Sequence, residues 1–265
     1  MGLYDKYEHI LAERAGRVLT LTLNRPDQLN ATNAALHAEL STIFYDANLD
    51  NEAEVIVLTG AGRAFCAGGD TNWMQEMIDE PVAWRRTVTE AKKIVFGLLD
   101  LEKPIIAKLN GHAVGLGATI ALYCDVIFAS EKARIGDPHV AVGFVAGDGG
   151  AAIWPAHIGY ARAKEFLMTG ELLSAQRAAE IGLINHAVPA DELDAAVDAF
   201  AKRLLGGARR AIQWTKMAVN VNLRQQVTTS LECSLALEGL SNFSADHQEG
   251  VNAFNEKREP KFTGT

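Results

Sequence analysis

Apolar residues in the first half of the chain gather in short runs, and a glycine or a polar loop follows each run. Val18–Leu23 alternates apolar residues with threonine, as a strand with one buried face does. Val55–Thr59 and Ile105–Leu109 are almost wholly apolar, which is typical of strands buried on both faces. Longer segments between them, ending at Leu49 and spanning Val82–Leu99, have the length of helices. Strands that alternate with helices predict an α/β fold.

The second half of the chain has a different pattern. Short strands are predicted at Val126–Ala129 and Ala133–Ile135, and strand signals nearly vanish after residue 150. The helix-like segments that follow are 161–168, 175–181, 191–204, 208–221, 226–241 and 246–256. We therefore predict an α/β core over residues 1–185 and an all-helical region over residues 186–265.

Two of the predicted strands lead into glycine-rich turns. Val55–Thr59 is followed by Gly60–Asp70, and Ile105–Leu109 by the glycines of Lys108–Thr119. Either turn taken alone is explained equally well by tight chain reversal. Where such a turn opens a helix, however, its unpaired N–H groups and the helix dipole favour an anion. One N–H from each turn could converge on an acyl oxygen and stabilise an enolate or a tetrahedral oxyanion.

Five segments carry a resemblance to a known family. They read A-F-C-A-G-G-D at Ala64–Asp70 and N-G-x-A-x-G-x-G from Asn110, with further matches at 24–31, 124–129, 178–185 and 253–262. In this order they are similar to the crotonase (enoyl-CoA hydratase/isomerase) superfamily. The resemblance implies a spiral of strand–strand–helix turns that ends in a helical C-terminal trimerisation region. It also implies an acyl-CoA substrate and a homotrimer or a dimer of trimers.

The resemblance further implies roles for individual residues. The N–H groups of Cys66 and Leu116 correspond to the two oxyanion donors. A backbone donor tolerates any side chain, so the leucine within the family's G-G-G position leaves this role intact. The positions implied for substrate and CoA binding are Arg25, Leu29, Ala64, Ala67, Gly68, Asp70, Gly115 and Thr119. We expect no separate cofactor, because coenzyme A is part of the substrate, and no metal, because no His/Cys cluster has metal-ligand spacing.

The family's acid–base residues are replaced in this chain. Hydratases of the family have glutamates at the positions of Thr119 and His139, and isomerases keep the second of them. His139 could act as general base if Asp148, nine residues on, held its ring. The alternative is that His139 only lines the pocket and Asp148 caps the helix that follows. The sequence alone favours neither the acid–base pair nor the pocket-wall and cap interpretation.

Three functions remain open on these residues. The first is an enoyl-CoA hydratase-like lyase that works through a stabilised enolate, with His139 and Asp148 as acid–base pair. The second is a carbon–carbon bond hydrolase of β-diketones, whose substrate need not carry CoA. The third is a non-catalytic member that binds CoA and assembles with partners, because both glutamates are missing.

Three further motifs each allow a functional and a structural explanation. Cys66 in its glycine turn is a candidate nucleophile, although the resemblance gives this position a backbone role. Gly147–Ala152 matches the dinucleotide fingerprint, but Pro155 follows and no second parallel strand closes a βαβ unit. Trp73, Met74 and Met77 are spaced along one helical face and fit either a core stripe or an acyl pocket.

Charge limits the partners. The chain carries a net charge of −8, which argues against nucleic acid because nucleic acid requires a basic face. An anionic ligand such as coenzyme A would then need local cations. The candidates are Arg25, Arg63, Lys257 and Arg258, each of which is equally an ordinary surface charge.

The few cysteines and the first ten residues bear on the cellular compartment of the protein. Three cysteines without a C-x-x-C pair fit a reducing, cytoplasmic environment. The first ten residues are charged and contain no apolar signal segment. No stretch approaches the roughly 20 apolar residues that a membrane helix needs, so we expect no membrane partner.

Overall fold

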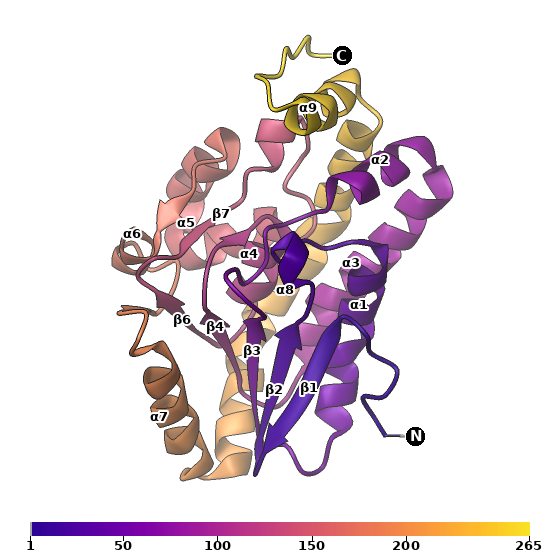
Figure 1. Cartoon of the computed structure of the whole chain (residues 1–265). Helices are drawn as coiled ribbons and strands as arrows, with labels where there is room; N and C mark the ends of the chain where they lie inside the picture. The colour runs from indigo at the N-terminus through magenta and orange to yellow at the C-terminus, as the bar shows by residue number, and fades with distance from the viewer. Residues whose placement is uncertain (1) are drawn as a thin grey trace.

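A six-stranded sheet forms the centre of the computed structural model, which describes residues 2–265 (Figure 1). Its strands lie in the order β1-β2-β3-β4-β6-β9. Their bounds are β1 Ile10–Ala15, β2 Val18–Leu23, β3 Val55–Gly60, β4 Ile105–Leu109, β6 Val126–Ser130 and β9 His186–Val188. β1 and β2 form an antiparallel hairpin, and all later neighbours pair in parallel. The parallel pairing brings the ends of β3 and β4, and the glycine turns that follow them, to one edge of the sheet.

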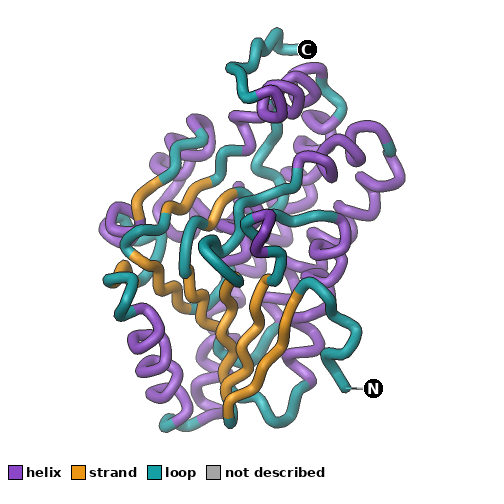
Figure 2. Tube along the Cα trace, viewed as in Figure 1, coloured by secondary structure: helices purple, strands orange, loops and turns teal. Residues whose placement is uncertain are grey.

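Helices cover both faces of this sheet (Figures 1 and 2). α1 (Ala34–Leu49) and α3 (Pro81–Asp100) pack over one face, where Leu21, Ile56 and Leu58 join the main core. α7 (Leu193–Leu205) covers the other face, and its apolar residues contact those of β3, β4 and β6. Since β3 and β4 are buried on both faces, they read as unbroken apolar runs in the sequence.

A second layer carries the turns and short elements beyond the sheet edge. A three-stranded sheet is built from β5 (Ala113–Val114), β7 (Arg134–Gly136) and β8 (Leu173–Ser174). The surrounding helices are α2 Thr71–Asp79, α4 Leu116–Leu122, η2 His139–Val142, α5 Gly150–Thr169, α6 Ala175–Glu180, α8 Arg209–Asn242 and α9 Ala245–Glu256, with a short η1 at Pro26–Gln28. This arrangement confirms the predicted mixed α/β fold.

The helical region does not form a unit apart from the core. The sheet extends past residue 185, because β9 pairs with β6. α8 is one continuous helix of 34 residues where two were predicted. Its Val227, Leu231 and Leu235 belong to the same hydrophobic core as the strands. Pro155 lies within α5, and the backbone departs from helical geometry only at Gly159, where φ is 76°.

The helices of residues 2–265 lack the features of membrane-spanning segments. None of them combines the length and the apolar composition that a bilayer crossing requires.

Asn30 ties the loop after β2 to the loop after β3. It is fully buried, and its amide nitrogen donates to the carbonyls of Ala61 and Ala64, both at 2.9 Å. Its side-chain oxygen accepts the N–H of Arg25 at 2.8 Å. The residue has a left-handed backbone, with φ of 57°, which asparagine tolerates better than most residues.

We expect Asn30→Ala to lower the free energy of unfolding by about 2–4 kcal/mol, because buried carbonyls lose their donor and alanine disfavours this backbone. Urea denaturation measures the change. The control is Asn51→Ala at an exposed position, which should stay within about 0.5 kcal/mol of the parent. A loss below about 1 kcal/mol for Asn30→Ala would show that the amide does not hold the two loops together.

Candidate active site

A cavity lies between the glycine turns and the helices that cover them. Its wall is largely apolar and aromatic, and most of its polar groups are ionisable. The lining residues come from α1, α2, α3, α4, α8 and the segment 139–148, and they include His37, Trp73, Trp84, Leu116, His139, Phe144, Asp148 and Glu238. A mostly apolar pocket with a few convergent ionisable groups is the usual form of a binding or catalytic site.

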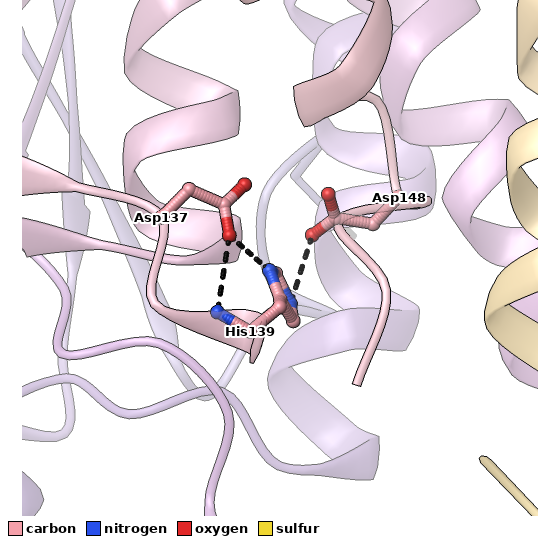
Figure 3. Close-up of side chains that lie close together, drawn as sticks. All are labelled: Asp137, His139 and Asp148. Atoms are coloured by element: carbon pink, nitrogen blue, oxygen red, sulfur yellow. Dashed lines mark hydrogen bonds and ion pairs between the residues drawn. The ribbon is translucent and has the colours of Figure 1, made fainter. Parts of the chain in front are cut away.

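His139 stands between two carboxylates (Figure 3). Its Nδ1 hydrogen-bonds Asp137, whose side chain is fully buried. Its Nε2 lies 3.9 Å from Oδ2 of Asp148. The sequence-based dyad is therefore corrected in one respect: Asp137 holds the ring, while Asp148 faces the other nitrogen without a hydrogen bond. Asp137 is two residues away in the sequence, and its role was missed because a D-P-H tripeptide is also an ordinary turn.

Asp148 is held by the residue that replaces the first family glutamate. The hydroxyl of Thr119, at the middle of α4, donates to Oδ1 of Asp148 at 3.1 Å. The N–H of Gly150 lies 3.3 Å from the same oxygen, so the carboxylate also supports the start of α5. The geometry thus agrees with the cap interpretation of Asp148, and its part in an acid–base pair stays a prediction. One oxygen caps the helix, and the other lies in the cavity beside His139.

Glu238 is a cavity residue that the sequence analysis missed. It lies on α8, is only 4% exposed, and its carboxylate has no hydrogen-bond partner within residues 2–265. A signal was present in the sequence, because Glu238 continues the apolar face formed by Val227, Leu231 and Leu235 at helical spacing. A charged residue on such a face is a candidate for function or for a shifted pKa.

Burial and mutual charge shift the pKa values of these groups. Burial opposes the charged form of His139, but the carboxylates of Asp137 and Asp148 outweigh it and raise the pKa of the ring to about 10. Burial raises the pKa of Asp148, although the charge of His139 works against this. Burial and the Asp148 carboxylate raise the pKa of Glu238 well above its usual range. A pKa of about 10 favours the protonated ring at neutral pH, as suits a proton donor, and the acid–base role of His139 stays a prediction.

Cys66 does not have the role predicted for it. Its N–H donates to the carbonyl of His112 at 3.1 Å, so this N–H is not available to an acyl oxygen. The side chain is fully buried, and burial raises the pKa of the thiol, which disfavours the thiolate that a nucleophile needs. Cys66 instead links the two glycine turns, since its carbonyl accepts the N–H of Val114 at 2.9 Å.

Gly69 is a second candidate for the oxyanion donor of this turn. It lines the cavity, and within residues 2–265 its N–H has no acceptor. Gly68 before it has φ of 93°, which turns the chain and is a conformation that glycine adopts readily. Leu116 lies across from this turn as the first residue of α4, and its N–H likewise has no acceptor in the described chain. Leu116 also lines the cavity, and its part as an oxyanion donor stays a prediction.

A second hollow shares Gly69, Met74 and His139 with the cavity, and we call it the mouth. Of the residues predicted to bind substrate, three line it, namely Ala67, Gly68 and Gly115. Gly115 has φ of 54°, and a side chain there would meet the His139 ring at 3.5 Å. The residues that line the mouth include no lysine or arginine.

The other predicted binding residues hold the loops together. Arg25 donates to the carbonyl of Ala31 and pairs with Asp70 at 3.2 Å. Asp70 also caps α2 through the N–H of Asn72. The Leu29 carbonyl accepts the N–H of Ala67 at 3.1 Å, and Ala64 is buried. These four residues line neither the cavity nor the mouth.

Of the remaining cation candidates, Arg63 and Lys257 are exposed, and Arg258 is paired with Glu249 and Glu256. The stripe of Trp73, Met74 and Met77 serves both predicted roles, because all three residues line the cavity while belonging to a small buried cluster.

The cluster of Asp137, His139 and Asp148 also deserves comparison with a metal site. One ligand atom from each lies within 4.8 Å of the others, so their spacing alone admits a cation. However, Nδ1 of His139 is bonded to Asp137, and a cation there would displace this bond. The expectation that the protein uses no metal stays a prediction.

Comparisons with known proteins agree with this geometry. The sequence pattern of the enoyl-CoA hydratase/isomerase family matches residues 13–265. A short-chain-enoyl-CoA hydratase from Clostridium acetobutylicum is 33% identical over 94% of this chain and 95% of that protein. The crystal structure of an enoyl-CoA hydratase/isomerase from Mycobacterium paratuberculosis superposes with a TM-score of 0.91 at 38% identity, covering 94% of this chain and 99% of that one.

A third relative differs in its reaction. A β-diketone hydrolase from the cyanobacterium Anabaena, solved with (S)-3-oxocyclohexyl acetic acid, superposes with a TM-score of 0.84 at 31% identity. The match covers 91% of this chain and 96% of that one. Taken with the match over residues 13–265, these likenesses show that this chain is an enzyme of the enoyl-CoA hydratase/isomerase family, within the crotonase superfamily.

Proposed function

We propose that this enzyme adds water to an α,β-unsaturated acyl-CoA through an enolate, with His139 and Asp148 in place of the family's two glutamates. The observation that supports this most directly is the contact between Thr119 and Asp148. By resemblance, Thr119 occupies the position of the glutamate that activates water. Because Thr119 binds Asp148, a carboxylate again lies at this place in the cavity, although it comes from a different part of the chain.

The pKa shifts of Asp148 and His139 support a role in proton transfer for each residue. Asp148, with its pKa raised by burial, accepts the proton of the attacking water. His139, charged at neutral pH, gives its proton to the α-carbon as the enolate collapses. Asp137 stabilises the imidazolium and fixes the ring. The N–H groups of Gly69 and Leu116 hold the thioester oxygen, and such donors contribute about 2.7–4 kcal/mol each to transition-state stabilisation.

A second candidate is the hydrolysis of a carbon–carbon bond in a β-diketone. It is favoured by the Anabaena β-diketone hydrolase at 31% identity and by a mouth whose lining has no lysine or arginine for a CoA phosphate. Water would add to one carbonyl carbon, and the carbon–carbon bond would then break to give a carboxylic acid and an enolate. The same oxygen donors would hold the enolate until His139 protonates its carbon.

A substrate panel decides between these functions and the non-catalytic alternative. We expect the parent enzyme to hydrate crotonyl-CoA and to leave cyclohexane-1,3-dione intact. His139→Ala and Asp148→Asn should each lower kcat by about 10²–10⁴-fold, since each removes one half of the proton transfer. The double variant should lose less than the product of both effects, because the two residues serve one step. Steady-state hydration assays measure all three variants.

Matched controls carry the same substitutions outside the cavity. His186→Ala and Asp191→Asn change exposed residues and should keep the parental rate. Cleavage of the dione without hydration of crotonyl-CoA would replace the first function with the second. CoA binding without turnover of either compound would favour the non-catalytic alternative. If His139→Ala keeps a rate within threefold of the parent, His139 only lines the pocket and takes no part in proton transfer.

The pKa shifts predict the pH dependence of kcat/KM. Since His139 acts as an acid and its pKa is raised to about 10, activity should persist to about pH 9 and fall as pH rises through 10. The acidic limb should lie above that of an ordinary aspartate, because burial raises the pKa of Asp148. A rate that instead increases through pH 10 would assign His139 as a base.

Loss of activity through unfolding at high pH must be distinguished from the titration of His139. A raised histidine pKa contributes stability that is complete below pH about 6.5 and is lost as pH rises through about 10. Initial rates should therefore be taken directly after transfer to high pH, with recovery at pH 7 as the check.

We further propose that the enzyme assembles into a closed ring of identical subunits, as the resemblance implies. Large apolar side chains are exposed along α8 and next to it, among them Trp214, Val219, Leu240 and Phe243. Such residues usually mark an interface. Light scattering at micromolar concentration should give the mass of a trimer or hexamer, and a monomer would contradict the proposal. Leu240→Glu should weaken assembly, whereas the exposed Glu52→Gln should not change it.

A further inference from the structure

One polar side chain in the cavity wall, His37, is paired with a glutamate behind it and is not used by the proposed reaction. His37 lies in the first turn of α1 and is 2% exposed. Its Nδ1 is 2.7 Å from Oε2 of Glu90 on α3, whose side chain is 12% exposed. The pair joins two helices that cover the same face of the sheet. His37 lines the cavity together with His139, Asp148 and Glu238.

The second ring nitrogen of His37 has no protein partner. A carboxylate only accepts hydrogen bonds, so Glu90 fixes the hydrogen on Nδ1 and leaves Nε2 of the neutral ring as an acceptor. Within residues 2–265 no donor reaches Nε2, and the ring packs on Trp73 at a centroid distance of 4.9 Å. An acceptor without a partner in a mostly apolar wall is a natural contact for a ligand that brings a donor.

The wall around His37 is otherwise apolar. Trp73, Met77, Val88 and Ala91 line the same cavity, and the Thr87 hydroxyl is already bonded to a carbonyl of its own helix. A hydroxyl in this cavity therefore meets side-chain acceptors in two places, the acid–base cluster around His139 and Nε2 of His37, besides the donor N–H groups of Gly69, Leu116 and the tryptophan indoles. A purely hydrocarbon acyl group would leave Nε2 unpaired.

We propose that His37 selects acyl groups that carry a hydroxyl remote from the thioester, with Nε2 accepting its hydrogen bond. The inference rests on the proposed function, because it takes the acyl group of the substrate to fill this cavity. Glu90 is a positioning residue, since it sets which ring nitrogen accepts. Selectivity would follow from the unpaired Nε2, because sites built to hydrogen-bond a substrate reject analogues that lack the matching group.

Saturated thioesters test the selection without turnover. Binding of hexanoyl-CoA is compared with that of its 4-, 5- and 6-hydroxy forms and with 5-oxohexanoyl-CoA by titration calorimetry. We expect one hydroxy form to bind the parent about tenfold more tightly than hexanoyl-CoA, the effect of one well-placed hydrogen bond. His37→Phe should abolish this preference and change hexanoyl-CoA affinity by less than threefold, because the ring volume is kept.

Two further variants keep the test decisive if His37→Phe does not fold. His37→Phe leaves Glu90 without its partner, so the double variant His37→Phe/Glu90→Gln replaces it if the single one does not fold. Glu90→Gln alone should weaken the hydroxyl preference, because an amide no longer fixes the hydrogen on Nδ1. The variants Asn51→Ala and His186→Ala, remote from the cavity, serve as matched controls.

Each outcome decides the matter. Equal affinity of the parent for all thioesters, or a preference that survives His37→Phe, would overturn the role of His37 and leave the proposed hydratase function standing. A preference for the 5-oxo form would show a charged donor at Nε2 and overturn the hydroxyl assignment. No binding of any thioester, together with no hydration of crotonyl-CoA, would overturn the proposed function and the inference with it.

Discussion

The contact between Nδ1 of His139 and the buried carboxylate of Asp137 determines the chemistry of the cavity. A charged ring inside a protein is unfavourable unless an opposite charge accompanies it. Asp137 supplies that charge, and Asp148 adds to it from the other side of the ring. The proton that results on His139 is retained at neutral pH. With the ring positive, a carboxylate and not the imidazole is the group able to accept a proton from water.

The helical second half of the chain holds this arrangement in place. The hydroxyl of Ser234 on α8 donates to the Gly147 carbonyl at 2.8 Å, next to Asp148. His247 on α9 donates through Nδ1 to the Val142 carbonyl at 2.7 Å, and its ring stacks on Phe144. The segment 142–148 is therefore fixed from both sides. These helices contribute directly to the site, as Glu238 does by lining it, in addition to any role in assembly.

Loss of the family's glutamates need not mean loss of function. The position of the first glutamate is occupied by Thr119, whose hydroxyl recruits the Asp148 carboxylate from another loop. The position of the second is occupied by His139, which carries a proton because two carboxylates flank it. Two ionisable groups thus lie at this place in the cavity, although neither has the side chain found in typical hydratases. The same groups could also serve a β-diketone, and so the surroundings of the cavity must select the reaction.

The sequence by itself determined the strands, the two glycine turns and the family, and it singled out His139 and Asp148 as candidates. These depend on local patterns: an apolar run that must be buried, a glycine that permits a turn, and residue types at fixed spacing. Only the tertiary structure decided which N–H groups are free, because the Cys66 N–H is taken by His112, a residue 46 positions away that only folding brings near. It also decided that Asp137 holds the ring, that Glu238 and His37 line the cavity, and that Arg25 pairs with Asp70. Hydrogen-bond partners and pKa values follow from distances and burial between distant segments, and no local pattern in the chain encodes them.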